Sequence, residues 1–304
     1  MMKPNRKIAR IYVLYLIINI LFLSCHSRKP NYISYYNKVN EIDSIYRMAK
    51  QPEKARILYR KLFRKYPPKN QERIEELETY IRLSDRYGKN SHTKKDLYTL
   101  IPLMAPYWKD KKNDPEFLSL YKKYGIDNIE IEQKITKWKK SLNKQLIDSF
   151  TVAFIRDKAE NRLNDQLREI NDRKNAKLLK WTFENYGFPS LQKIGLWGNN
   201  NVFMPMEVLL LHMADVAEYR TYFKTKMIEY VKSGDCFPRD YAGMLDRQNM
   251  HLRLPRNYAV YQGYEDIEDS AQIDRNRKNL GVPSIRHRAK IARDFYDSLK
   301  LKQK

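Results

Sequence analysis

Apolar side chains recur every three or four residues along most of this sequence, and prolines separate one such run from the next. The clearest run lies between Pro52 and Tyr66, where its alanine, leucine, tyrosine and phenylalanine side chains share one helical stripe. Pro52 suits the first turn of a helix, and Pro67 and Pro68 stop it. The chain has only 9 glycines and no long alternation typical of strands, so we predict an all-α fold.

The same spacing predicts helices over residues 71–86, 115–124 and 129–159. The segment 96–108 carries two prolines, so short helices and loops are expected there. Within the third helix, residues 134–144 place apolar side chains on one side and lysines on the other. Such a stripe ordinarily faces the core, and the alternative is that it lies on an anionic membrane surface.

The segment Val39–Pro67 resembles one tetratricopeptide hairpin, with Ala55, Tyr59 and Leu62 along its second helix and Pro67 closing it. No second copy follows at the usual period of about 34 residues. A single repeat cannot form a binding groove by stacking on others of its kind. We therefore interpret the segment as a helical pair packed on its neighbours, and peptide binding is the alternative.

The first 25 residues have the three parts of a bacterial signal peptide, namely a basic start, an apolar run from Ile11 to Leu23, and Ser24 before Cys25. Because the apolar run is too short for a stable membrane span, residues 1–24 are expected to be removed. The ending resembles the relaxed lipobox of Bacteroidota-type lipoproteins, in which the cysteine carries lipid. This resemblance implies a membrane partner reached through lipidated Cys25. A retained signal anchor with an incidental cysteine is the alternative.

Residues 25–38 are expected to form a tether between the lipid and the folded part. The segment 26–30 is basic rather than acidic, and an acidic segment would resemble a surface-export signal. A cell-envelope position facing the periplasm is therefore predicted, with inner or outer membrane left open. The other cysteine, Cys236, is interpreted as a packing or turn residue, since two cysteines are too few for a disulfide framework.

The chain is strongly basic, with 59 basic and 36 acidic residues and a formal charge of +23. Such a charge suggests nucleic acid in many proteins, but no motif of a nucleic-acid-binding module accompanies it here. We therefore expect no nucleic-acid partner and assign most of the charge to solvated helix surfaces. A protein or an anionic envelope polymer is the next candidate partner.

The stretch of residues 181–215 is the best place to look for a site. It leads through a loop with Pro205 into an apolar run from Met206 to Tyr219, which is predicted to be helical. At helical spacing His212 and Asp215 share one stripe of this run and are neighbours. The pair is interpreted first as a core histidine held by its carboxylate. Half of a metal site and an acid/base pair are the alternatives.

Residues 165–281 resemble a bacterial family called domain of unknown function 6624, which implies a C-terminal domain over residues 161–304 after a helical N-terminal region, 39–160. The landmarks that carry the resemblance follow in order: Asp165-Gln166 with Arg168, Tyr186-Gly187-Phe188-Pro189, Gly195, Leu211-His212-Met213-Ala214-Asp215, Asp246-Arg247, and Ile273-Asp274-Arg275-Asn276-Arg277 before Leu280-Gly281. The family has tryptophan at the position of Phe188 and glutamine at that of Leu211. Its tyrosine-glycine-threonine-glutamine segment is replaced by residues 258–261. The resemblance implies no known reaction.

Further candidates lie on the helix expected after Pro238 and near the end of the resemblance. An Asp246 and Arg247 pair ordinarily bridges helices. Asp274 and Arg277 lie three residues apart and can pair on one helix face. His251 lies one turn after Arg247. The candidate residues fall into two overlapping sets: for catalysis His212, Asp215, Asp246 and Arg247, and for metal binding His212, Asp215, His251 and Asp274.

Strong enzymatic signatures are absent from the sequence, which has no HExxH, phosphate-binding glycine loop, serine elbow or paired-cysteine zinc motif. We therefore expect a cell-envelope lipoprotein that binds a partner or ligand, with its cofactors unknown. The alternative is a hydrolase, possibly metal-dependent, with a site around His212 and Asp215. A structural protein that holds an envelope polymer by charge is a third possibility.

Overall fold

The computed structural model describes five stretches of the chain: residues 31–69, 74–89, 91–158, 164–261 and 269–302. These residues are largely helical, which confirms the predicted all-α class. Their one β feature is an isolated antiparallel bridge between Trp197 and Phe203. None of the helices in these stretches has the length and hydrophobicity that a membrane span requires. The predicted signal peptide and Cys25 lie outside the described residues.

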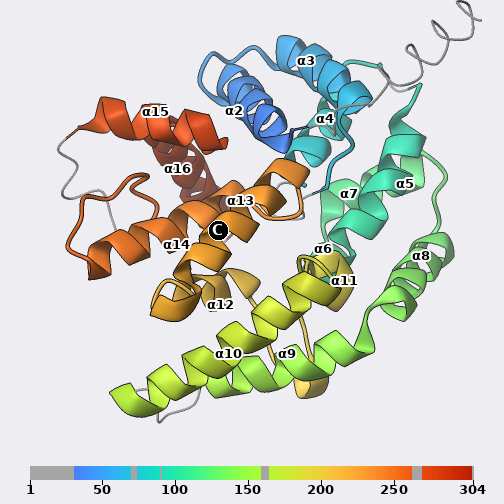
Figure 1. The fold of residues 1–304 in the computed structure, drawn as a ribbon. Coiled ribbons are helices and arrows are strands. Elements are labelled where there is room, and N and C mark those ends of the chain that lie inside the picture. The colour runs from blue at the N-terminus through green and yellow to red at the C-terminus, as the bar shows by residue number, and fades with distance from the viewer. Residues whose placement is uncertain (1–30, 70–73, 90, 159–163, 262–268, 303–304) are drawn as a thin grey trace, which may run out of the picture. The chain divides into compact units, whose positions relative to one another are not determined.

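The N-terminal half is a succession of helices, of which the first four described, α2 to α5, each pack on the next (Figure 1). They are α2 (Tyr32–Arg47), α3 (Pro52–Lys65), α4 (Glu75–Arg86), α5 (Thr93–Met104), η2 (Ala105–Tyr107), α6 (Trp108–Lys111), α7 (Pro115–Lys123), α8 (Asn128–Ser141) and α9 (Lys144–Asp157). Helix α2 packs on α3, α3 on α4, α4 on α5, and α5 on α8. The predicted helix after Pro52 is confirmed, and the tetratricopeptide likeness of this region stays a prediction.

The C-terminal half is helical as well and packs on α2, the first helix of the described residues (Figure 1). Its elements are α10 (Asp165–Asn185), α11 (Leu191–Ile194), η4 (Asn199–Asn201), α12 (Met206–His212), η5 (Ala217–Tyr219), α13 (Arg220–Ser233), α14 (Pro238–His251), α15 (Ser270–Leu280) and α16 (Ile285–Lys302). Helix α2 contacts α13, α15 and α16, and α9 contacts α10. The two predicted regions, 39–160 and 161–304, therefore pack into one compact unit, Asn31–Lys304.

Helix α2 begins at Tyr32, inside the segment expected to be a tether. The predicted tether of residues 25–38 overlaps this helix, and Tyr32, Tyr35, Tyr36 and Val39 are all buried. These four residues recur at helical spacing, so one face of α2 is apolar from its first residue onward. Three packed tyrosine rings fix one face of residues 32–38 in the core, so this segment is not a linker.

Two glycines allow the ends of α13 and α15 to touch α2 directly. Gly234 and Gly281 follow these helices with φ of +83° and +90°, the left-handed region that favours glycine. A Cβ on Gly234 would lie 2.6 Å from Cγ of Tyr32, and a Cβ on Gly281 would lie 2.7 Å from Cβ of Tyr36. At both turns a tyrosine side chain of α2 therefore occupies the space that a Cβ would need.

A buried polar network joins α2 to α16. Nε2 of His287 lies 2.7 Å from Oδ2 of Asp43, and Nε of Arg47 donates to Oδ1 of Asp43 at 2.8 Å. Nη1 of Arg47 also donates to Asp294 at 3.1 Å. Burial by itself raises the pKa of Asp43, but the hydrogen bonds from His287 and Arg47 outweigh it, so the net pKa lies below its usual range.

The predicted helix over 129–159 is divided into α8 and α9. The division falls at Asn143, whose side chain accepts a hydrogen bond from the backbone N–H of Leu146 at 3.0 Å and so caps α9. Ile135 is fully buried and Trp138 is half-buried against the core. The apolar stripe of this tract therefore faces the core, and its membrane alternative is wrong.

Candidate functional site

Helix α12 ends sooner than its apolar run indicated. It stops at His212, and three successive turns follow. In the last of them the N–H of Asp215 donates to the carbonyl of His212 at 3.0 Å. Nε of Arg220 donates to the carbonyl of Ala214 at 2.8 Å and holds this turn. The prediction of one helix to Tyr219 is therefore wrong. The side chains of His212 and Asp215 bind different partners.

His212 belongs to a group of three ionisable side chains from three helices. Its Nδ1 lies 2.7 Å from Oδ1 of Asp157, the last residue of α9. One ligand atom from each of Asp157, Asp172 and His212 lies within 4.8 Å of the others. Both carboxylates are buried and the His212 side chain is 13% exposed. We call these three residues the His212 group.

This group is able to do two different things chemically. Two carboxylates and an imidazole are the ligand types of many divalent-metal sites, although three protein ligands leave at least one position to water or substrate. Alternatively, the hydrogen bond to Asp157 fixes the tautomer of His212 and ties α9 to α12. Asp157 and Asp172 also have other partners. Because buried carboxylates repel each other, the group needs a cation or hydrogen-bond donors beside it.

Polar side chains extend the surroundings of Asp172 along α10. Asn175, one turn later, is fully buried, and its Oδ1 accepts a hydrogen bond from Nη1 of Arg156 at 2.7 Å. Its amide nitrogen is buried without a hydrogen-bond partner. The junction of α9 and α10 therefore buries more polar groups than a purely apolar core.

Asp215 lies at the centre of a second group, on the side of α14. Arg247 donates to both carboxylate oxygens of Asp215, with Nη2 2.6 Å from Oδ2, and its Nη1 donates to the hydroxyl of Tyr261 at 2.6 Å. Nδ1 of His251 lies 2.9 Å from Oδ1 of the same carboxylate. This fork geometry fixes the turn after α12 against α14.

Asp246 and Arg277 hold one loop from two sides. Both are fully buried. The carboxylate of Asp246 accepts hydrogen bonds from the N–H groups of Tyr258 and Val260 at 2.9 and 2.7 Å, and Arg277 donates to the carbonyls of Tyr258 and Ala259. Burial raises the pKa of Asp246, and these backbone hydrogen bonds offset the increase only in part. The contacts of both residues are structural.

Asp274 is also occupied by the backbone, since its Oδ1 accepts the N–H of Ile285 at 2.9 Å. The four predicted metal ligands, His212, Asp215, His251 and Asp274, do not come together in one site. Among the described residues, the His212 group is the one whose ligand atoms lie close enough together to share a metal ion. The physical reason is that Asp215 is neutralised by Arg247, and Asp274 anchors the first turn of α16.

Two members of the His212 group, Asp157 and Asp172, were not predicted from the sequence. Both interrupt an apolar stripe, because Asp157 follows Phe150 and Phe154 at helical spacing and Asp172 precedes Ala176 on the buried face of α10. A carboxylate on the core side of a helix is unusual unless it is paired. That position was the signal that could have identified them.

A cavity of about 550 Å³ lies beside α12 and α14, and we call it the α12–α14 cavity. Nine of its lining residues come from the 181–215 stretch: Phe188, Pro189, Ser190, Leu191, Leu196, Phe203, Met206, Glu207 and Leu211. Tyr261, which binds Arg247, and Val260, whose N–H binds Asp246, also form part of the wall of this cavity.

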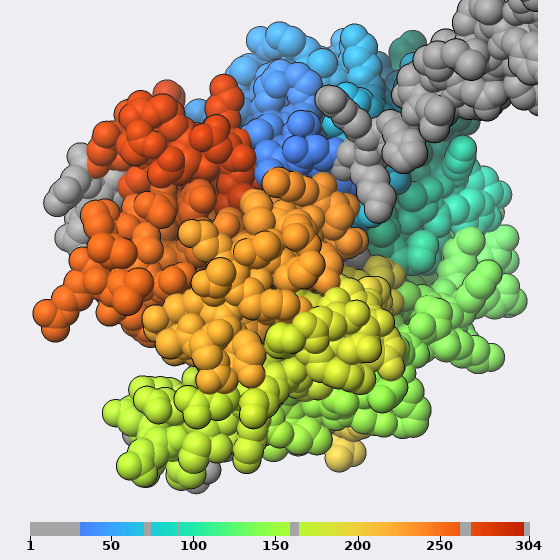
Figure 2. All heavy atoms as spheres, viewed as in Figure 1, coloured from blue at the N-terminus to red at the C-terminus, as the bar shows by residue number. Residues whose placement is uncertain are grey.

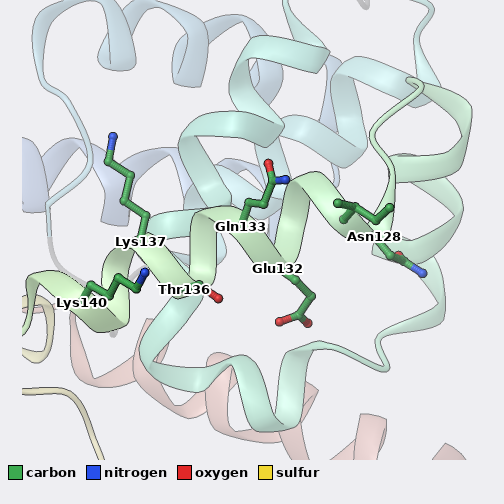
Figure 3. A pocket seen from close by; sticks show the side chains of 7 residues that line it. Asn128, Glu132, Gln133, Thr136, Lys137 and Lys140 are labelled. Carbon is green, nitrogen blue, oxygen red and sulfur yellow. The ribbon is translucent and has the colours of Figure 1, made fainter.

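Two other hollows differ in kind. A larger one, about 1070 Å³, runs between the N-terminal helices and α14–α16, and several of its charged side chains pair with each other, including Asp43 with Arg47. The hollow along α8 is lined by one helix face, and its side chains, such as Glu132 and Lys137, do not converge (Figure 3). The α8 hollow has no opposing wall and is not a site candidate.

No family model, no curated protein and no solved structure matches the chain. The resemblance of residues 165–281 to domain of unknown function 6624 therefore stays a prediction.

Proposed function

We propose that this protein is a lipid-anchored cell-envelope protein that binds a ligand in the α12–α14 cavity. The observation that supports binding is the cavity itself, whose volume of about 550 Å³ falls within the usual range of roughly 300–1,000 Å³ for ligand pockets. The proposed anchor rests on the leader and Cys25. The binding surface belongs to the compact unit Asn31–Lys304.

The lining predicts the chemistry of the ligand. Most of the wall is apolar or aromatic, which favours a ligand with an apolar body. The charged lining residues are three acids, Glu207, Asp235 and Asp240, and one base, Arg239. The lining therefore carries more acidic than basic side chains, whereas the whole chain has a net charge of +23. This acidic lining favours a ligand that carries a cationic group, such as an amine or a lysine-containing peptide segment.

The departures from the resembled family support the same cavity. Phe188 and Leu211 stand where that family has tryptophan and glutamine, and Val260 and Tyr261 lie in the replaced polar segment. All four residues line the α12–α14 cavity. If the resemblance holds, this chain has changed the ligand specificity of one cavity while keeping the residues that support it.

Binding is tested by native mass spectrometry of the full-length protein, extracted in mild detergent from cells that express it. A bound mass is expected on the unmodified protein, and its fragments should contain an amine and an apolar group. Leu211→Trp fills the cavity and should lose that mass, whereas Leu118→Trp, at an exposed side chain of α7, should keep it. Glu207→Gln removes one exposed charge without adding volume and should weaken binding. Retention of the mass in the Leu211 variant contradicts the proposal.

The anchor has an independent test. Labelled fatty acid should be incorporated into the protein and lost in Cys25→Ser. The matched control is Cys236→Ser, because Cys236 is the other cysteine and is fully buried. A mature chain that still begins at Met1, or label that survives in Cys25→Ser, would overturn the anchor and leave the cavity proposal untouched.

A second candidate function is supported by the His212 group, which has the ligand types and spacing of a divalent-metal site. A bound metal would suit hydrolysis, the alternative predicted from the sequence, by acidifying water or polarising a substrate. The residues that would hold it are Asp157, Asp172 and His212. Asp215 would not take part, since it is paired with Arg247.

Zinc, manganese and magnesium added separately to the purified protein test this site. Equilibrium dialysis should give one bound ion, lost in Asp172→Asn and His212→Gln and kept in Asp215→Asn. If none of the three ions binds and His212→Ala lowers the unfolding temperature, the group is a buried structural junction, and the metal proposal is refuted.

A further inference from the structure

Four exposed apolar side chains gather where α9 meets the loop around η4. Val152 and Ile155 on α9 are 53% and 55% exposed, and Trp197 and Phe203 in the loop are 38% and 39% exposed. Exposed apolar side chains are ordinary when single, but a contiguous patch of them marks a contact surface. We call these four residues the α9–η4 surface.

Contacts between α9 and the loop show that the four residues share one side of the molecule. The N–H of Asn199 donates to Oγ1 of Thr151 at 3.0 Å, and Nζ of Lys158 donates to the carbonyl of Phe203 at 3.1 Å. Ile155 lies between Thr151 and Lys158 on the same helical stripe, four residues after one and three before the other. The loop therefore runs along α9 beside Ile155. Figure 1 shows η4 beside α9, and Figure 2 shows this segment reaching the surface there.

Lysines flank the aromatic rings of this surface. Nζ of Lys158 lies 5.4 Å from the ring centre of Phe203, and Nζ of Lys109 lies 5.0 Å from that of Trp197. The acid beside this surface, Asp148, accepts a hydrogen bond from Nδ2 of Asn199 at 2.8 Å and lies 3.5 Å from Nζ of Lys144. Aromatic rings with lysines at their margins are the side chains that occupy the boundary between headgroups and acyl chains.

We propose that the α9–η4 surface docks on a membrane surface that contains anionic lipid. The apolar side chains would enter the headgroup boundary, while Lys109 and Lys158 meet lipid phosphates. A second copy of this chain fits less well, because it would bring the same lysines and a net charge of +23 against them. The inference deepens the proposed anchor, since a lipidated Cys25 would hold the body close enough to dock.

The test uses a chain that begins at residue 26, which contains the whole compact unit Asn31–Lys304 and lacks both the leader and the acylated cysteine. Sedimentation with phosphatidylcholine vesicles, with or without phosphatidylglycerol, measures membrane binding. Binding is expected on the anionic vesicles. The double variant Val152→Ser, Ile155→Ser should bind about tenfold more weakly, because each lost apolar group reduces burial in the boundary.

The matched control is the double variant Ile129→Ser, Leu254→Ser, which removes two exposed apolar side chains elsewhere, 69% and 52% exposed, and should bind like the unmodified protein. Equal weakening in both double variants would overturn the proposal, as would absence of binding to anionic vesicles. A dimer on gel filtration that dissociates in Val152→Ser, Ile155→Ser would assign the surface to a second copy instead. None of these outcomes affects fatty-acid labelling of Cys25, so failure of docking and failure of the anchor are distinguishable.

Discussion

Replacing Gly281 by alanine tests the packing of the C-terminal half on α2. Gly281 follows α15 with φ of +90°, and a Cβ there would lie 2.7 Å from Cβ of Tyr36 and 3.3 Å from the carbonyl oxygen of Ile33. Cβ of Tyr36 cannot move by a change of rotamer, because it is bonded to the backbone of α2. The alanine methyl group therefore forces the turn and the helix apart.

The cost of this substitution has two parts. Alanine in the left-handed region costs about 1–2 kcal/mol, and relieving an overlap in a packed interior costs about 1–3 kcal/mol. Gly281→Ala should therefore lower the free energy of unfolding by roughly 2–5 kcal/mol. Gly88 provides the matched control, since its φ is +61° and a Cβ there would meet nothing within 4 Å. Gly88→Ala should cost only the first part, about 1–2 kcal/mol.

Urea denaturation followed by circular dichroism measures both variants against the unmodified protein. The difference between the two costs isolates the packing of the α15 turn on α2. Equal costs for Gly281→Ala and Gly88→Ala would refute the reasoning, because they would mean that nothing occupies the space beside Gly281.

Two further predictions concern the charged networks. Arg247→Lys should lower the free energy of unfolding by about 2 kcal/mol, because lysine cannot make the bidentate contact with Asp215. The control Arg253→Lys, on the surface, should change it very little. Equal unfolding midpoints of the two variants in urea would contradict this prediction. Asp43 has a folded pKa below its unfolded value, so its stabilisation is present above about pH 4 and is lost as the pH falls through the lowered folded pKa. Asp43→Asn should therefore be less stable than the unmodified protein at pH 7 by about 2 kcal/mol. It should also lose less stability between about pH 5 and pH 3. An unchanged pH dependence of the free energy of unfolding over this range would argue against the network.

The sequence alone determined the helical class and the positions of several helices. Glycine scarcity, proline stops and three-to-four spacing are local properties, and they predicted α3 and α7 closely and the start of α14. Helix ends were less certain where they depend on a single cap, as at Asn143. The same spacing identified His212 and Arg247 as polar residues next to core positions, although it could not name their partners.

Only the tertiary structure decided those partners. Asp157 is 55 residues from His212 in the chain, and a helical stripe tells which face is buried but not which helix covers it. Asp215 does not share a helical stripe with His212, because α12 ends at His212 in a series of turns. Arg220 holds these turns through the carbonyl of Ala214, a contact that no local pattern predicts. The cavity beside α12 likewise exists only because separated segments close around it. Helical periodicity is a property of neighbours along the chain, whereas sites are made by neighbours in space.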